Sequence, residues 1–243
     1  MAVLSTGVDA ELPAGTDKIP LASAVLPRLT IALQVTDIVR SLGYPPAATP
    51  PAPVVRLTEQ ILAEARTWLQ PRGAYSLWAV DRQTAHTLEI GGVAIAGNIG
   101  EFLQGADRIA VFMVTVGSEI TWQAEARFRA GDAFAGLALD AIGSWAAEAA
   151  AEALMGHLHS QLGSGESFTL RYSPGYCGMD LGQQRMLFKL APAGSVDISL
   201  LPSLLMQPLK SISGIVGLGP REAVGIHLSP CERCPQVGCH MRR

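Results

Sequence analysis

The sequence predicts an α+β fold, in which helices pack against a sheet. Short apolar runs typical of strands are mixed irregularly with helical segments, and 49% of the residues are apolar while 16% are charged. Residues 132–161 form a long alanine-rich segment that is apolar around most of a helix. Such a helix needs cover on most sides, so we expect it at the centre of the fold.

Three segments divide the chain of 243 residues. Residues 1–28 show no sustained period, so we interpret them as an N-terminal arm that is extended or disordered until docked. Residues 29–228 form one principal domain, since a chain of this length fits one large core better than two equal ones. Residues 229–243 form a cysteine-rich tail.

Within the domain, periodicity and breaker residues place the elements in order. We expect a semi-rigid linker at 44–53, which holds five prolines in ten residues, and a Ser/Gly-rich piece ending at Gly219. Helices are expected at 37–42 (capped by Thr36), 57–69, 99–104, 117–129, 132–161 and 183–190. Strands are expected at 29–34, 74–80, 87–94, 108–116, 168–172, 197–200 and 223–228.

Composition excludes several classes of function. The formal net charge is -3 and no basic cluster precedes Arg242-Arg243, so nucleic acid is not an expected partner. The longest apolar stretch, 133–158, is interrupted by charged side chains, so no membrane span is expected. The N-terminus lacks the pattern of a signal peptide, which makes the cytoplasm the default location.

The segment Arg171-Tyr-Ser-Pro-Gly-Tyr176 follows a predicted strand and precedes a predicted helix. Loops at such strand ends commonly hold ligands. A guanidinium there can grip a carboxylate, and Tyr176 can lie against an aromatic base. S-adenosylmethionine carries both groups. On residue types alone, an arginine at a strand end before a Pro-Gly turn is more often a surface residue.

Arg171-x-x-x-Gly175-Tyr176 resembles the S-adenosylmethionine signature of the activation (reactivation) domain of cobalamin-dependent methionine synthase. Met206-x-Pro208-x-x-Ser211-x-Ser213-Gly214 is similar to a second block of that family. Ala147-Glu148-Ala-Ala-Ala-Glu152 is similar to its helix that supplies a ligand-binding glutamate. This resemblance implies a twisted, mainly antiparallel sheet with packed helices, and a free-standing form of the domain.

The resemblance also implies the contacts to S-adenosylmethionine. They would come from Arg171 and Tyr176, from backbone groups near Ser173 and Gly175, and from Glu148 as the acidic contact. Ser213, in the second block, is a secondary candidate, because without the resemblance a Ser/Gly turn beside a strand is the favoured interpretation.

Two places depart from the family pattern. Gly175-Tyr176 is followed by Cys177-Gly-Met-Asp where the family commonly has Pro-Ala-Cys. The family's further acidic contact, near the start of its domain, falls close to residues 34–37 and does not align, so it is left unassigned.

The C-terminal tail reads Cys231-Glu-Arg-Cys234-Pro-Gln-Val-Gly-Cys239-His240. Three thiols at this spacing are soft ligands for zinc or an iron-sulfur cluster, with His240 or Cys177 as the fourth. Free or redox-active thiols are the alternative interpretation.

The resemblance implies a protein that presents S-adenosylmethionine for the reductive remethylation of cob(II)alamin, and so a methyltransferase component in methionine biosynthesis. The sequence holds no Asp-x-His-x-x-Gly corrinoid motif. We therefore expect cobalamin on a partner methyltransferase and one electron from a flavodoxin-like or ferredoxin-like donor. The alternative hypothesis is a metal- or cluster-carrying accessory protein that passes electrons through its Cys tail.

Overall fold

The computed structural model describes residues 18–44, 48–176 and 178–224, and within them one antiparallel sheet dominates. Its strands follow the order β4-β3-β2-β5-β9-β6, while β1 pairs with the other half of β2. The predicted antiparallel α+β class is confirmed. The strands are β1 (Ala22–Leu26), β2 (Arg72–Gln83), β3 (Thr87–Ile90), β4 (Val93–Ala96), β5 (Arg108–Thr115), β6 (Glu166–Phe168) and β9 (Ser211–Pro220), and β7 (Ser199–Leu200) with β8 (Met206–Gln207) forms a separate hairpin.

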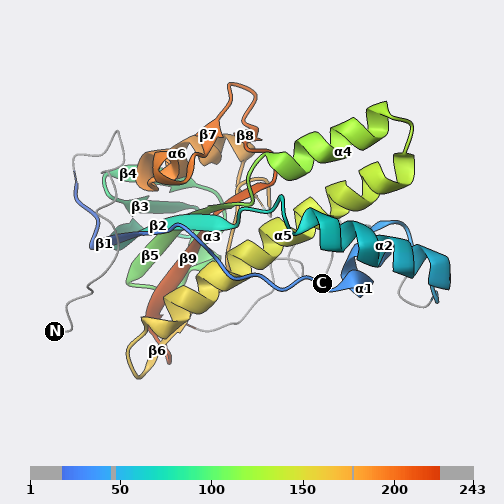
Figure 1. Cartoon of the computed structure of the whole chain (residues 1–243). Coiled ribbons are helices and arrows are strands. Elements are labelled where there is room, and N and C mark those ends of the chain that lie inside the picture. The colour runs from blue at the N-terminus through green and yellow to red at the C-terminus, as the bar shows by residue number, and fades with distance from the viewer. Residues whose placement is uncertain (1–17, 45–47, 177, 225–243) are drawn as a thin grey trace.

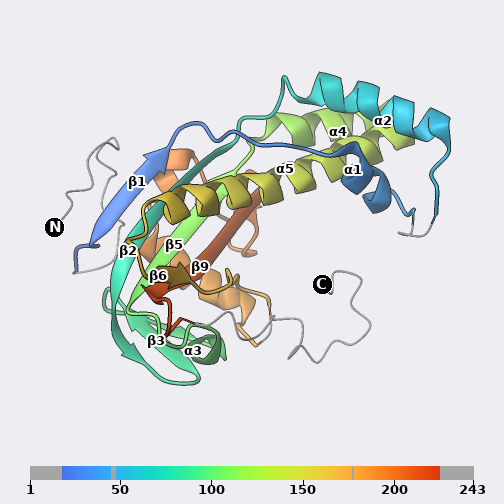
Figure 2. The same cartoon turned by 90° about the horizontal axis from the view of Figure 1, so that it is seen from below.

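Helices cover both faces of this sheet (Figure 1). The longest, α5, spans 28 residues and lies across one face, with its N-terminus capped by the Asp132 carboxylate, which accepts the N–H of Ala135. Helices α1, α2 and α4 pack against α5 (Figure 2). The helices are α1 (Val35–Ser41), α2 (Ala52–Ala65), α3 (Ile99–Phe102), α4 (Glu119–Arg129), α5 (Ala133–Ser160) and α6 (Gln184–Leu190).

The sheet separates two hydrophobic cores. Alternate residues of β5 point to opposite faces, so Phe112 and Val114 pack with α5 while Val111 and Met113 pack with the α3 and α6 side. Both faces of the central strands are therefore buried. This explains the continuous apolar run of residues 108–116. None of the helices in the described ranges is both long and apolar enough to cross a membrane.

Several predicted elements differ from the structure. Residues 29–34 form no strand, whereas the expected arm contains β1, which pairs with β2. The predicted strand at 87–94 is a hairpin, because Gly91 and Gly92 adopt φ values of 56° and 75° and turn the chain. Most important, the expected Ser/Gly-rich turn region is the interior strand β9.

The remaining differences concern boundaries. Helix α2 begins at Ala52, inside the proline-rich linker, since prolines are tolerated in the first turn of a helix. The predicted strand at 168–172 ends at Phe168, and Tyr172 makes an isolated bridge to Ile215. Of the predicted strand at 223–228, Ala223 and Val224 lie in a turn and the rest is outside the described residues.

Glu166 ties β6 to its neighbours. One carboxylate oxygen accepts the N–H of Gly163 at 2.7 Å, and the other pairs with Arg108, which reaches across β9. The Gly163 N–H, together with the Arg108 guanidinium, holds the pKa of Glu166 below its ordinary value despite the opposing effect of burial.

A carboxyl group whose folded-state pKa is lowered stabilises the fold above its unfolded pKa of about 4.3 and loses this contribution as the pH falls through the folded value. We therefore expect Glu166→Gln to lower the free energy of unfolding at about pH 7 and to change it little at about pH 2. Urea denaturation at both pH values measures this. The control is Glu89→Gln, whose pair with Arg82 is exposed and 3.9 Å long. An equal cost of Glu166→Gln at both pH values would contradict the assignment.

Candidate functional site

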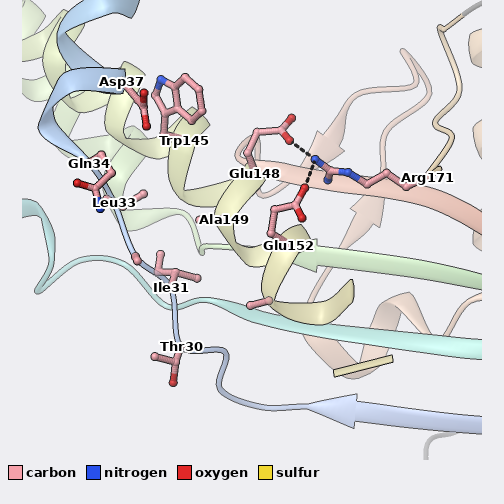
Figure 3. A pocket seen from close by; sticks show the side chains of 12 residues that line it. Thr30, Ile31, Leu33, Gln34, Asp37, Trp145, Glu148, Ala149, Glu152 and Arg171 are labelled. Carbon is pink, nitrogen blue, oxygen red and sulfur yellow. Dashed lines mark hydrogen bonds and ion pairs between the residues drawn. The ribbon is translucent and has the colours of Figure 1, made fainter. Parts of the chain in front are cut away.

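A cavity of about 450 Å³ lies between α5 and the irregular segment that leads into α1 (Figure 3). Segment 30–34 has no regular secondary structure and forms one wall, while α5 forms the other. The lining residues are Thr30, Ile31, Ala32, Leu33, Gln34, Asp37, Trp145, Glu148, Ala149, Glu152, Ala153 and Arg171. The volume is in the range of about 300–1,000 Å³ that is usual for small-molecule sites.

Arg171 reaches this cavity because of the residue that follows it. Tyr172 exchanges two backbone hydrogen bonds of 2.8 Å with Ile215 of β9. Its ring is buried in the core on the far side of the sheet, where it stacks on Phe102 at a centroid distance of 4.9 Å. Since successive side chains of an extended chain point to opposite faces, Arg171 is directed toward α5.

The Arg171 guanidinium contacts two carboxylates of α5. Its Nη2 lies 2.5 Å from Glu148 Oε2 and 3.1 Å from Glu152 Oε1. The two glutamates are four residues apart, so they share one face of the helix. The Arg171 side chain is 22% exposed, which leaves it accessible from the cavity. The site therefore presents a cation and anions side by side, the arrangement that an amino-acid group requires.

The other end of the cavity is formed by α1. Asp37, from the first turn of that helix, and the Trp145 indole both line it. Trp145 Nε1 donates a hydrogen bond of 2.7 Å to Ser41 Oγ, which fastens α5 to α1. This end thus combines an aromatic ring with a carboxylate.

Arg171 and Glu148, each predicted to contact the ligand, are brought together by the structure. The rest of the motif lies in a turn, in which Gly175 has a φ of 91° and its N–H donates to the Met179 carbonyl at 2.9 Å. The Ser173 carbonyl accepts the N–H of Tyr176 at 3.3 Å, and Tyr176 is 57% exposed. Ser173, Gly175 and Tyr176 do not line the cavity, so their proposed contacts remain predictions.

Ser213 faces away from the cavity. It stands opposite Met113 in the β5–β9 register, and paired residues of antiparallel strands point to the same face. Met113 belongs to the core on the side of α3 and α6, so the Ser213 side chain lies across the sheet from Arg171. Nearby, Ser211 Oγ donates to the Pro208 carbonyl at 2.7 Å, which holds the entry to β9.

Three lining residues were not assigned from the sequence. Glu152 follows Glu148 by four residues, and this helical spacing could have predicted that both carboxylates face the same side. Asp37 lies in the region where the family's acidic contact could not be aligned, and no motif in the sequence points to Trp145. Only the packing of α1 on α5 brings Asp37 and Trp145 to one cavity.

The predicted metal ligands Cys231, Cys234 and Cys239, with His240 and Cys177, lie outside the described residues. Among the residues that are described, no group of three or more His, Cys, Asp or Glu side chains is placed to hold a metal ion.

Gly214 allows the strand end that carries Arg171 to approach β9. A Cβ at this position would lie 2.8 Å from the Phe112 ring and 2.9 Å from the Tyr172 carbonyl oxygen. We expect Gly214→Ala to lower the free energy of unfolding by about 1–3 kcal/mol through overpacking.

The matched control for this prediction is Gly156→Ala on the solvent side of α5, where an added Cβ meets nothing within 4 Å. There alanine should raise the free energy of unfolding by about 0.5–1 kcal/mol, because of its higher helix propensity. Chemical denaturation measures both changes. If Gly214→Ala left the free energy of unfolding unchanged, the close contacts of Gly214 with Phe112 and Tyr172 would not constrain this position.

The chain is thus an α+β domain in which two carboxylates of the central helix pair with a strand-end arginine at the edge of a cavity. The chain matches the family "vitamin B12 dependent methionine synthase, activation domain" over residues 76–224 and belongs to that family. Among solved structures, it resembles the MetH reactivation domain bound to AdoHcy, with a TM-score of 0.55 and 16% identity over 91% of this chain and 86% of that one. No curated protein matches.

Proposed function

We propose that this protein binds S-adenosylmethionine in the cavity beside α5 and presents it for the reductive remethylation of cob(II)alamin on a separate corrinoid methyltransferase. One observation carries the proposal: in a chain of the activation-domain family, Arg171 is held at the cavity by Glu148. The structural neighbour bound to AdoHcy, the demethylated form of the same ligand, supports it.

The cavity suits the amino-acid end of the ligand. Arg171 has a guanidinium with several donors, so it can bind the ligand carboxylate while it keeps one hydrogen bond to Glu148. The Glu148 carboxylate, held beside Arg171, can then accept from the ligand ammonium. Glu152 is 66% exposed at its side chain, so its contact with the guanidinium can give way to the ligand carboxylate at low cost.

The adenosine end would extend from Arg171 along the turn that carries Tyr176. The Tyr176 ring is exposed and follows Arg171 by five residues on the same loop. A tyrosine ring offers a flat apolar face to an adenine base. The backbone groups of Ser173 and Gly175, which belong to the same turn, would meet the nucleoside.

The chemistry asked of the protein is positional. S-adenosylmethionine supplies an activated methyl group, and a corrinoid on the partner, reduced by a flavodoxin-like or ferredoxin-like donor, supplies the nucleophile that accepts it. The residues of this chain bind and orient the donor, and no proton transfer is required of them. This agrees with a site made of permanent charges and an aromatic ring.

Calorimetry with S-adenosylmethionine tests the proposal at Arg171. We expect Arg171→Ala to weaken binding by tenfold or more, about 1.4 kcal/mol, because the ligand carboxylate loses its partner. The matched control is Arg185→Ala, an exposed arginine of α6 away from the cavity, which should bind as the wild type does. If the wild type binds no better than Arg171→Ala, the proposed function is wrong.

A second pair of variants tests the adenine contact. Tyr176→Ala should weaken S-adenosylmethionine binding by several-fold, since stacking of a base on an aromatic side chain is worth about 1–3 kcal/mol. Tyr176→Phe keeps the ring and should retain most of the affinity. Because Tyr176 is exposed, neither variant should alter the unfolding transition. Equal affinities for all three proteins would remove Tyr176 from the site.

A further inference from the structure

The cavity is richer in negative than in positive charge. Three carboxylates line it, from Asp37, Glu148 and Glu152, against the single guanidinium of Arg171. Arg40 lies 3.7 Å from Asp37 but is 56% exposed at its side chain and does not line the cavity, so it compensates Asp37 only weakly. Among the described residues that line the cavity, two negative charges are left in excess.

Two of the three carboxylates are only partly screened by solvent, whereas Glu152 is 66% exposed at its side chain. Asp37 and Glu148 have side-chain exposures of 34% and 36%, and Arg171 is more buried still. The Trp145 indole adds a face with negative electrostatic potential to the same wall, and such a face attracts cations. Charge and aromatic ring therefore act in the same direction, in favour of a positively charged ligand.

The methyl donor and its product differ in this respect. In S-adenosylmethionine the sulfur is a sulfonium with one positive charge. When the methyl group is transferred to a nucleophile, the sulfur–carbon bond breaks and its electron pair stays on sulfur, which becomes a neutral thioether. The amino-acid and adenosine groups are unchanged, so the ligand loses one unit of positive charge and one methyl group.

We propose that the carboxylates of this cavity select the methyl donor over its demethylated product by charge, so that methyl transfer itself lowers the affinity and promotes ligand exchange. This inference rests on the proposed function, because it assumes that the cavity holds S-adenosylmethionine. Asp37 and Glu152 are the determinants, because the single guanidinium of Arg171 is shared between Glu148 and Glu152, and Asp37 has only the exposed Arg40 beside it. Trp145 contributes through its indole face.

The size of the effect follows from Coulomb's law. Unit charges several ångströms apart near a protein surface interact by more than RT, and the interaction falls with ionic strength. We expect S-adenosylmethionine to bind roughly tenfold more tightly than S-adenosylhomocysteine at low salt. The ratio should shrink at about 0.5 M salt, where the Debye length is only a few ångströms.

The experiment is calorimetry of the full chain with both ligands and with sinefungin, in which an amine-bearing carbon replaces the sulfonium and keeps the positive charge. If charge decides, sinefungin binds like the methyl donor. Because the sinefungin amine also occupies the place of the methyl group, salt separates the two causes: a preference for the charged ligands that is unchanged at about 0.5 M salt reflects contact, and the inference is overturned.

Single variants locate the effect. Asp37→Asn and Glu152→Gln keep the shape of each side chain and remove its charge, and each should reduce the ratio of the two dissociation constants by several-fold. The control is Glu59→Gln on the exposed face of α2, outside the cavity, which should leave the ratio unchanged. A fluorescence titration of tryptophan emission, to which Trp145 contributes, gives an independent readout.

The outcomes separate the two proposals. Tight binding of both ligands with equal affinity leaves the proposed function standing and overturns the charge selection. A salt-sensitive preference for the donor that Asp37→Asn or Glu152→Gln abolishes supports it. Failure of both ligands to bind the wild-type protein overturns the proposed function, and the charge selection with it.

Discussion

The packing of α5 on the sheet is the contact on which the other parts of the structure depend. The helix buries small and medium side chains against the strands, among them Ala146, Ala150 and Leu154, each with no exposed surface. These meet Phe112 and Val114 of β5 in the same core. Helices α1, α2 and α4 then pack on α5. A change that shifts α5 would therefore move one wall of the cavity together with half of the core.

The same helix packs on the sheet with one side and lines the cavity with another. The face toward the sheet is apolar, while Trp145, Glu148 and Glu152 project toward segment 30–34 and Arg171. Two adjacent residues of the facing strand end also point to different sides of the sheet. Tyr172 is buried in the core on the side of α3 and α6, and Arg171 contacts the carboxylates of α5 on the other side. The position of the guanidinium is thus set by the burial of its neighbour. This gives the charged side chains that line the cavity a rigid base.

The local sequence pattern was sufficient to predict the elements whose periodicity or apolar run is clear. The alanine-rich helix, the buried strand at 108–116 and the short helix near 99 all appear close to their predicted positions. The local pattern was insufficient where tertiary contacts override the structural preference of the residues, as in β9. Strand β9 contains Gly214, Gly217 and Gly219, which read as a turn, yet each glycine admits a close neighbour: the Phe112 ring, Ala106 and the Gly105 carbonyl, respectively. The twin glycines 91 and 92 were likewise placed inside a strand because a tight turn of this length leaves little polar signal.

The sequence by itself determined the fold class and the long central helix, because each depends on composition or on helical period within a short stretch of chain. Short motifs also named Arg171 and Glu148 as candidates, but not the ion pair between them. The sequence also carried the family, through blocks that recur in a set order. Only the tertiary structure decided which residues share the cavity. Asp37 and Trp145 are more than a hundred positions apart in the numbering, and Ser213 is removed from Arg171 by the thickness of the sheet. No sequence pattern predicts that Asp37 lies near Trp145 or that Ser213 lies far from Arg171, because these positions are set only when α1, α5 and β9 pack into the two cores.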